Sequence, residues 1–146
     1  MSADLRQLAH RLAYAALLPL VLGAGLIWLF GGQGMEQQYV FVGFAVSTYA
    51  SLVIAMLGGL HWGLSFARGL PLRGSLVWGA AAMSLGWVGV LMPPHAGLAL
   101  HGGMLIACYL VDRRLYPQLG AGGWLTLRFR LTLVAALSCF LAAAGS

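Results

Sequence analysis

The stretch YVFVGFAVSTYASLVIAMLGGLHWGLSF, residues 39–66, contains no Asp, Glu, Lys or Arg. A helix needs about 20 predominantly apolar residues to cross the hydrocarbon core of a bilayer. The stretch therefore predicts a membrane-spanning helix. Because it is longer than one crossing requires, we expect it to tilt, to bend at Gly58–Gly59, or to leave its last turns at the membrane interface.

The composition of the whole chain supports a membrane protein. Of its 146 residues, 61% are hydrophobic and 8% are charged, against roughly 45–50% and about 25% in ordinary globular domains. Eleven charged side chains cannot cover the surface of a soluble protein of this size, whereas lipid removes that requirement. Glycine, at 21 residues, is about twice as frequent as usual, which favours close packing between helices.

Four further apolar segments accompany residues 39–66. Pro93–Pro94 and His95 separate two of them, and this sequence predicts a tight turn between antiparallel spans. We treat the first segment as a span and not as a cleaved signal peptide. Residues 3–12 are expected to form an amphipathic helix at the membrane surface. The sequence thus predicts one all-α domain, an integral membrane bundle of five transmembrane helices at residues 12–30, 39–66, 76–92, 97–111 and 131–144.

The basic residues predict the orientation of these spans. All eight are arginines, and the five-span arrangement places every one of them on the same side of the membrane. Positively charged loops stay in the cytoplasm, so we expect a cytoplasmic N-terminus and an external C-terminus. Because the arginines occur in small groups between apolar runs, they do not indicate binding to nucleic acid.

Small residues are expected to mark the surfaces where helices meet. In the second span Ser47, Ala50 and Ile54 share one helix face with Gly58 and His61, and this face should point inward. The glycines predicted to pack helices together are Gly58, Gly59, Gly63, Gly86 and Gly89.

Two histidines lie within spans, where an ionisable group should face protein or a polar cavity. One hypothesis has His61 as a neutral imidazole bonded to a serine, a tyrosine or a backbone carbonyl. A second has a polar cleft for a proton, substrate or lipid headgroup, lined by His61, His101, Ser47, Ser51 and Tyr49. A third has haem b ligated by His61 and His101, but their predicted depths differ by about five residues, or some 7 Å.

Asp112 follows the fourth span and is expected to form an ion pair with Arg128 or Arg130 across the loop. Together with Arg113 and Arg114, these arginines could instead hold anionic lipid phosphates.

Motifs for catalysis are not found in the sequence. The three acidic residues are far apart, and there is no CxxC, no GxGxxG, no phosphate loop and no evident Ser-His-Asp arrangement. Cys108 and Cys139 lie in apolar segments without metal-site spacing. We therefore expect no enzyme activity, no metal site and no cofactor.

Three sequence elements resemble the domain of unknown function 3429, also called the transmembrane protein 69 family. They are GGLHWG at 58–63, LVDRRLYP at 110–117 and WLTLRFRLTLVAAL at 124–137. The resemblance implies a small multi-pass protein of the bacterial inner membrane, with mitochondrial relatives and no established activity. It also implies that the position of His61 tolerates arginine or glutamine, which argues against obligatory haem ligation.

Three functions follow as hypotheses. The first is an accessory, assembly or lipid-binding membrane protein whose partners are membrane lipids, a larger membrane complex or further copies of the chain. The second is a small oligomeric transporter or channel with a polar cleft around His61 and His101. The third is a haem- or quinone-binding redox protein.

Overall fold

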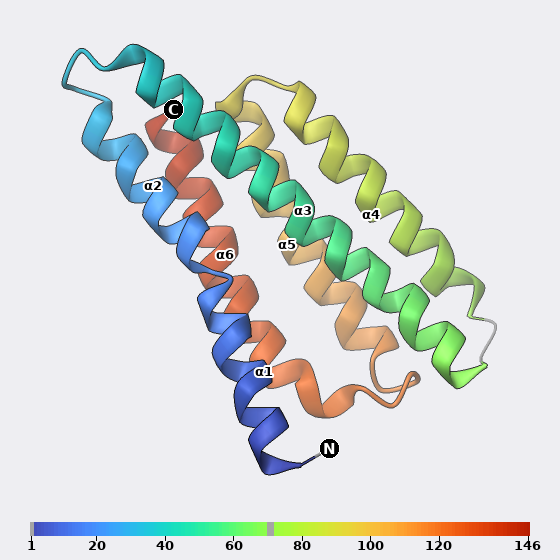
Figure 1. Cartoon of the computed structure of the whole chain (residues 1–146). Coiled ribbons are helices and arrows are strands. Elements are labelled where there is room, and N and C mark those ends of the chain that lie inside the picture. The colour runs from blue at the N-terminus through green and yellow to red at the C-terminus, as the bar shows by residue number, and fades with distance from the viewer. Residues whose placement is uncertain (1, 70–71) are drawn as a thin grey trace.

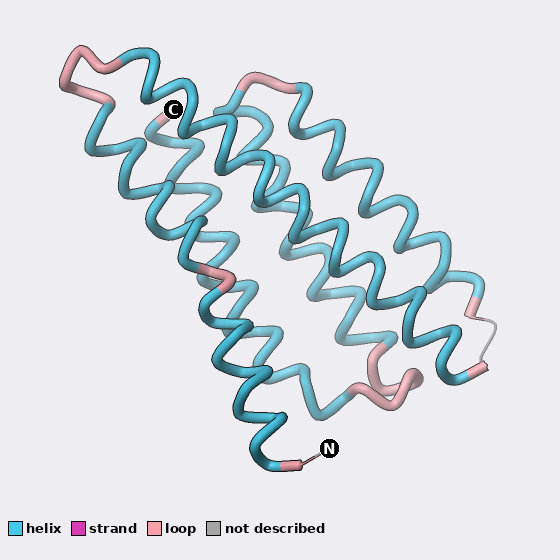
Figure 2. The backbone as a smooth tube through the Cα atoms, viewed as in Figure 1, coloured by secondary structure: helices cyan, strands magenta, loops and turns pink. Residues whose placement is uncertain are grey.

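The computed structural model describes residues 2–69 and 72–146, and the described chain folds into helices without strands (Figures 1 and 2). Five segments are long and apolar enough to cross a membrane, with α1 and α2 counted as one. The predicted all-α bundle with five spanning segments is thereby confirmed. In chain order the helices are α1 (Ala3–Ala15), α2 (Leu18–Phe30), α3 (Glu36–Arg68), α4 (Arg73–Leu91), α5 (Pro94–Leu115), the short 3-10 helix η1 (Gly122–Trp124) and α6 (Leu125–Gly145).

The long helices form two layers. In Figure 1, α2, α3 and α4 form the front layer, and α6 and α5 lie behind them. Helix α3 contacts α2, α4 and α5, and α6 contacts α2 and α5. The chain reverses its direction from one spanning segment to the next, so consecutive spanning segments run antiparallel (Figure 1).

The reversals form where the sequence contains proline and glycine. Pro93 precedes α5 and Pro94 is its first residue, where a missing N–H costs no helical hydrogen bond. The predicted turn at this place is confirmed. Helix α3 ends at Gly69, whose φ of 60° lies in the left-handed region that glycine adopts without a steric cost.

Most helices extend beyond the predicted spans, and α6 begins at Leu125 and not at residue 131. The reason is that the side chain of Arg128 is buried and forms an ion pair with Asp112 of α5. The first turns of α6 therefore pack against the bundle although they contain arginines. The segment predicted as an amphipathic surface helix is α1. It continues along the direction of α2 beside the start of α6 and does not lie across the end of the bundle (Figure 1).

A break between α1 and α2 follows from Pro19. Proline has no N–H, and the N–H of Leu20 bonds to the carbonyl of Leu17, so the carbonyl of Ala16 lacks its usual helical donor. The hydroxyl of Tyr49 on α3 donates to this carbonyl over 2.8 Å. Tyr49 therefore supports the helix break and does not line a polar cleft with the histidines.

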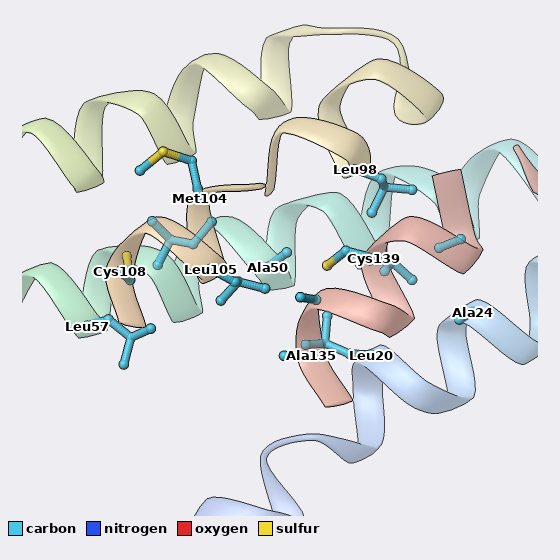
Figure 3. Close-up of a cluster of buried hydrophobic side chains, with 14 of the residues drawn as sticks. Leu20, Ala24, Ala50, Leu57, Leu98, Met104, Leu105, Cys108, Ala135 and Cys139 are labelled. Carbon is cyan, nitrogen blue, oxygen red and sulfur yellow. The ribbon is translucent and has the colours of Figure 1, made fainter. Parts of the chain in front are cut away.

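The core between the layers consists of leucine, isoleucine, valine, methionine, alanine and two free cysteines (Figure 3). Most large apolar side chains lie outside it, and Phe41 and Phe66, for example, are 73% and 69% exposed. An apolar outer surface of this extent fits a lipid environment.

The predicted packing glycines fall into two groups. Gly58, Gly86 and Gly89 lie at contacts between helices. A Cβ atom on Gly58 would lie 2.7 Å from the carbonyl oxygen of Gly79 on α4, and one on Gly86 would lie 3.3 Å from the hydroxyl oxygen of Ser51 on α3. Gly89 lies against the ring of His101 on α5. Gly59 and Gly63 are exposed, and a Cβ atom on either would have no neighbour within 4 Å. The prediction for these two was wrong, because one helical step turns a residue by about 100° away from the contact.

Candidate functional site

The arginines gather at one end of the bundle, where α1, α4 and α6 begin and α3 and α5 end (Figure 1). We call this the arginine end. It contains Arg6, Arg11, Arg68, Arg73, Arg113, Arg114, Arg128 and Arg130.

A buried chain of hydrogen bonds connects α3, α4, α5 and α6 near this end. His61 Nε2 lies 2.7 Å from Asp112 Oδ1, and Arg128 donates from Nε and Nη2 to Asp112 Oδ2 over 2.8 and 2.6 Å. On the other side of the imidazole, Ser75 Oγ lies 3.3 Å from His61 Nδ1, and Ser65 donates to Ser75 over 3.1 Å. We call these five residues the ionic network.

The ionic network follows from the cost of burying charge. Asp112 and His61 are fully buried and Arg128 is 9% exposed. A buried carboxylate is tolerated only when cations and hydrogen-bond donors satisfy its oxygens, and here both oxygens have such partners. Since a carboxylate only accepts, His61 Nε2–H is the donor to Asp112.

The predicted ion pair of Asp112 is confirmed with Arg128, whereas Arg113, Arg114 and Arg130 are exposed. The expected serine partner of His61 is also present, as Ser75, but its carboxylate partner was not predicted. Asp112 lies in the last turn of α5 and His61 near the end of α3, and this shared position close to the arginine end was the available signal.

The same contacts bring Ser75, His61 and Asp112 together, although the sequence showed no Ser-His-Asp arrangement. Ser75 is fully buried, and its hydroxyl also lies 3.2 Å from the backbone carbonyl of His61. None of the three residues is among those that line the apolar cavity of about 540 Å³ beside Arg128. In this arrangement the three residues join helices.

The second buried histidine has neutral partners. His101 Nε2 donates to the carbonyl of Gly86 over 2.9 Å, and Nδ1 lies 3.4 Å from Ser47 Oγ. His101 and Asp112 are eleven residues apart on α5, or about 16 Å along the helix axis. His61 contacts Asp112, so the two histidines occupy separate sites and do not line one cleft or face one iron.

An apolar cavity of about 540 Å³ lies on the other side of Arg128, between α1, α2, α3 and α6. Helix α3 contributes Met56 and Leu60, which are 58% and 43% exposed, so the cavity reaches the outer surface of the bundle. The alanines of α1 form the facing wall. Its apolar lining includes Ala9, Ala13, Ala16, Leu17, Leu20, Val53, Met56, Leu57, Leu60, Leu64, Leu105, Leu127, Leu131 and Ala135.

Four residues with polar groups in their side chains are among those that line the cavity: Tyr116, Trp124, Arg128 and Thr132. Thr132 is 6% exposed, and its hydroxyl is one of two buried side-chain polar atoms without a hydrogen-bond partner in the described chain. Burial, followed by the charge of Asp112, raises the pKa of Tyr116 to about 12, and Arg128 opposes this shift. Tyr116 therefore stays a neutral phenol at physiological pH.

Trp124 closes the arginine end of the cavity. Arg6 of α1 lies over its ring, 5.9 Å from the centroid, and the ring of His10 lies 5.6 Å away. These contacts and a light packing against α6 hold α1, whereas α2 packs against both α3 and α6. The cavity thus exists because α1 stays apart from α3 below the break at Pro19.

Comparison with known proteins places the chain in one family. Residues 5–144 match the family described as protein of unknown function DUF3429. Neither the curated proteins nor the solved structures include a match. Because the match covers nearly the whole chain, the protein belongs to the DUF3429 family.

Proposed function

We propose that this protein is a non-enzymatic, multi-pass membrane protein that binds a membrane lipid in the cavity between α1 and α3. The observation that carries the proposal is an apolar cavity of about 540 Å³ that reaches the exposed apolar surface of the bundle at Met56 and Leu60. Sites for small molecules have volumes of about 300–1,000 Å³, mostly apolar walls and a few polar groups that orient the ligand.

The location of the cavity favours a lipid over a water-soluble ligand. Met56 and Leu60 belong both to the cavity wall and to the exposed apolar surface. In a bilayer that surface contacts acyl chains, so a lipid can enter sideways without passing through water. The alkyl side chains of the wall offer water almost no hydrogen bonds, whereas they match a hydrocarbon tail.

The proposed setting is the inner membrane of a bacterium, with the arginine end in the cytoplasm. The eight arginines at one end support this orientation. The cavity then lies in the cytoplasmic leaflet. There the protein would act as an accessory component that holds a lipid for a larger membrane complex or for an assembly of its own copies.

Native mass spectrometry of the purified protein tests the proposal, together with a matched pair of variants on α1. Ala13 lines the cavity and Ala15 is exposed outside it. We expect one lipid to copurify with the native protein and with Ala15→Trp, and to be lost from Ala13→Trp because the indole occupies the cavity. Equal lipid occupancy in both variants, or none in the native protein, would contradict lipid binding at this place.

A further inference from the structure

The arginine end of the cavity carries groups that suit the headgroup of a lipid. Trp124 lines the cavity, and the guanidinium of Arg6 lies over its ring. Arg6 and His10 are one turn apart on α1, on the side of the helix next to Ala9 and Ala13, which line the cavity. The ring of His10 also packs against Trp124, and its Nδ1 donates to the carbonyl of Arg6. Arg6 and Trp124 are therefore held together beside the cavity.

Both residues have donors that are free to bind a ligand. Arg6 is exposed, and its guanidinium forms no ion pair within residues 2–69 and 72–146. A guanidinium that lies over an aromatic ring can still donate from its N–H edge. Nε1 of Trp124 makes no hydrogen bond to a described residue, and it is not one of the two fully buried atoms that lack a partner there. Its N–H is therefore accessible.

The charge of this end favours an anion. Among the described residues its only acids are Asp4 and Asp112, since Glu36 begins α3 at the opposite end. Asp112 is paired with Arg128, so it does not neutralise Arg6. Clusters of arginine at the cytoplasmic end of membrane helices attract anionic lipid headgroups by about 1 kcal/mol per residue.

A phosphate at Trp124 stays outside the ionic network. Trp124 and Arg128 are four residues apart, or about 6 Å along α6. The phosphate therefore does not displace Asp112 from Arg128, and no charge is buried without a partner. Beyond this point the wall is apolar as far as Ala16, which is ten residues from Arg6, or about 15 Å along α1. That depth accommodates a hydrocarbon chain.

We infer that the ligand is an anionic phospholipid, with one acyl chain in the cavity and its phosphate between Arg6 and Trp124. The phosphate oxygens accept from the guanidinium edge and from the indole N–H. The chain follows the alanines of α1, and the rest of the lipid lies against the exposed surface at Met56 and Leu60. This inference rests on the proposed lipid-binding function and assigns the headgroup of its ligand.

Binding of four defined probes to the delipidated protein in detergent tests this assignment. Dioleoylphosphatidylglycerol is the anionic lipid, dioleoylphosphatidylcholine adds a cation to the same phosphate, and dioleoylglycerol has no phosphate. The fourth probe, sn-glycerol 3-phosphate, has the phosphate without the chains. We expect the anionic lipid to bind at least about tenfold more tightly than dioleoylglycerol and more tightly than the phosphatidylcholine. The glycerol phosphate should not displace it at equal concentration.

Arg6→Gln removes the charge and should weaken binding of the anionic lipid about fivefold. Binding of dioleoylglycerol should stay unchanged, which shows that the variant keeps the cavity. Arg11→Gln is the matched control, because Arg11 is exposed on the same helix and points about 140° away from Arg6. It should bind every probe like the native protein.

Three results would overturn the assignment while leaving the lipid-binding function intact, provided that Ala13→Trp still abolishes binding. They are equal binding of the anionic lipid and either other lipid, equal losses in Arg6→Gln and Arg11→Gln, and displacement of the lipid by glycerol phosphate. If no lipid binds, or if Ala13→Trp has no effect on any of them, the proposed function fails as well.

Discussion

Helix α6 separates two regions of the arginine end that are built in opposite ways. Toward α3, α4 and α5, Arg128 belongs to the ionic network, whose five members are all hydrogen-bonded. Toward α1, the same residue borders a cavity in which Thr132 has no partner. The difference indicates a division of tasks: the ionic network holds the helices together, and the cavity is left unfilled for a ligand. Substitutions in the first region should change stability, and substitutions in the second should change binding.

Asp112→Ala should have the largest effect on stability. It leaves the charge of Arg128 and the Nε2–H of His61 buried without their partner. Breaking a buried ion pair from one side costs about 3–5 kcal/mol. We expect a loss of that size in the free energy of unfolding in detergent. Arg130 is exposed and lies two residues from Arg128, so Arg130→Ala is the matched control. It should change the free energy of unfolding by less than about 0.5 kcal/mol. Equal stability of the two variants would mean that the ionic network does not hold the bundle.

Gly58→Leu and Gly59→Leu form a matched pair one residue apart on α3. A side chain on Gly58 would collide with the backbone of Gly79, whereas one on Gly59 points away from the bundle. We expect Gly58→Leu to lower the free energy of unfolding by about 1–3 kcal/mol and Gly59→Leu to leave it within about 0.5 kcal/mol. Thermal denaturation of both proteins measures this difference, and the opposite order would refute the α3–α4 contact.

Thr132→Val should have the smallest effect on stability and the opposite sign. In the delipidated protein it removes a buried hydroxyl without a partner, so we expect a gain of up to about 1 kcal/mol. A loss of stability in the delipidated protein would show that Thr132 already has a partner there.

The sequence was sufficient for the architecture because few charges interrupt the apolar runs and all the arginines fall at one end. Asp112–Arg128 was also predictable, since a buried carboxylate near a cluster of arginines has to be paired. Ser75 was not found because it lies one residue before the predicted third span, in the first turn of α4.

Relations between helices were harder to predict. Gly58 and Gly59 look equivalent in the sequence, and only the position of α4 decides which of them is a contact. The cavity depends on how far α1 lies from α3, which follows from the break at Pro19 and from the contacts of Arg6 and His10 with Trp124. The spacing of apolar residues along one chain carries no information on such a distance.

An experimental structure of the protein in lipid nanodiscs, at a resolution that shows bound lipids, tests the division of tasks most directly. We predict continuous density for one lipid between α1 and α3, with the Asp112–Arg128 pair intact. A cavity closed by α1 packing against α3, or a lipid bound elsewhere with Arg128 turned away from Asp112, would contradict the account.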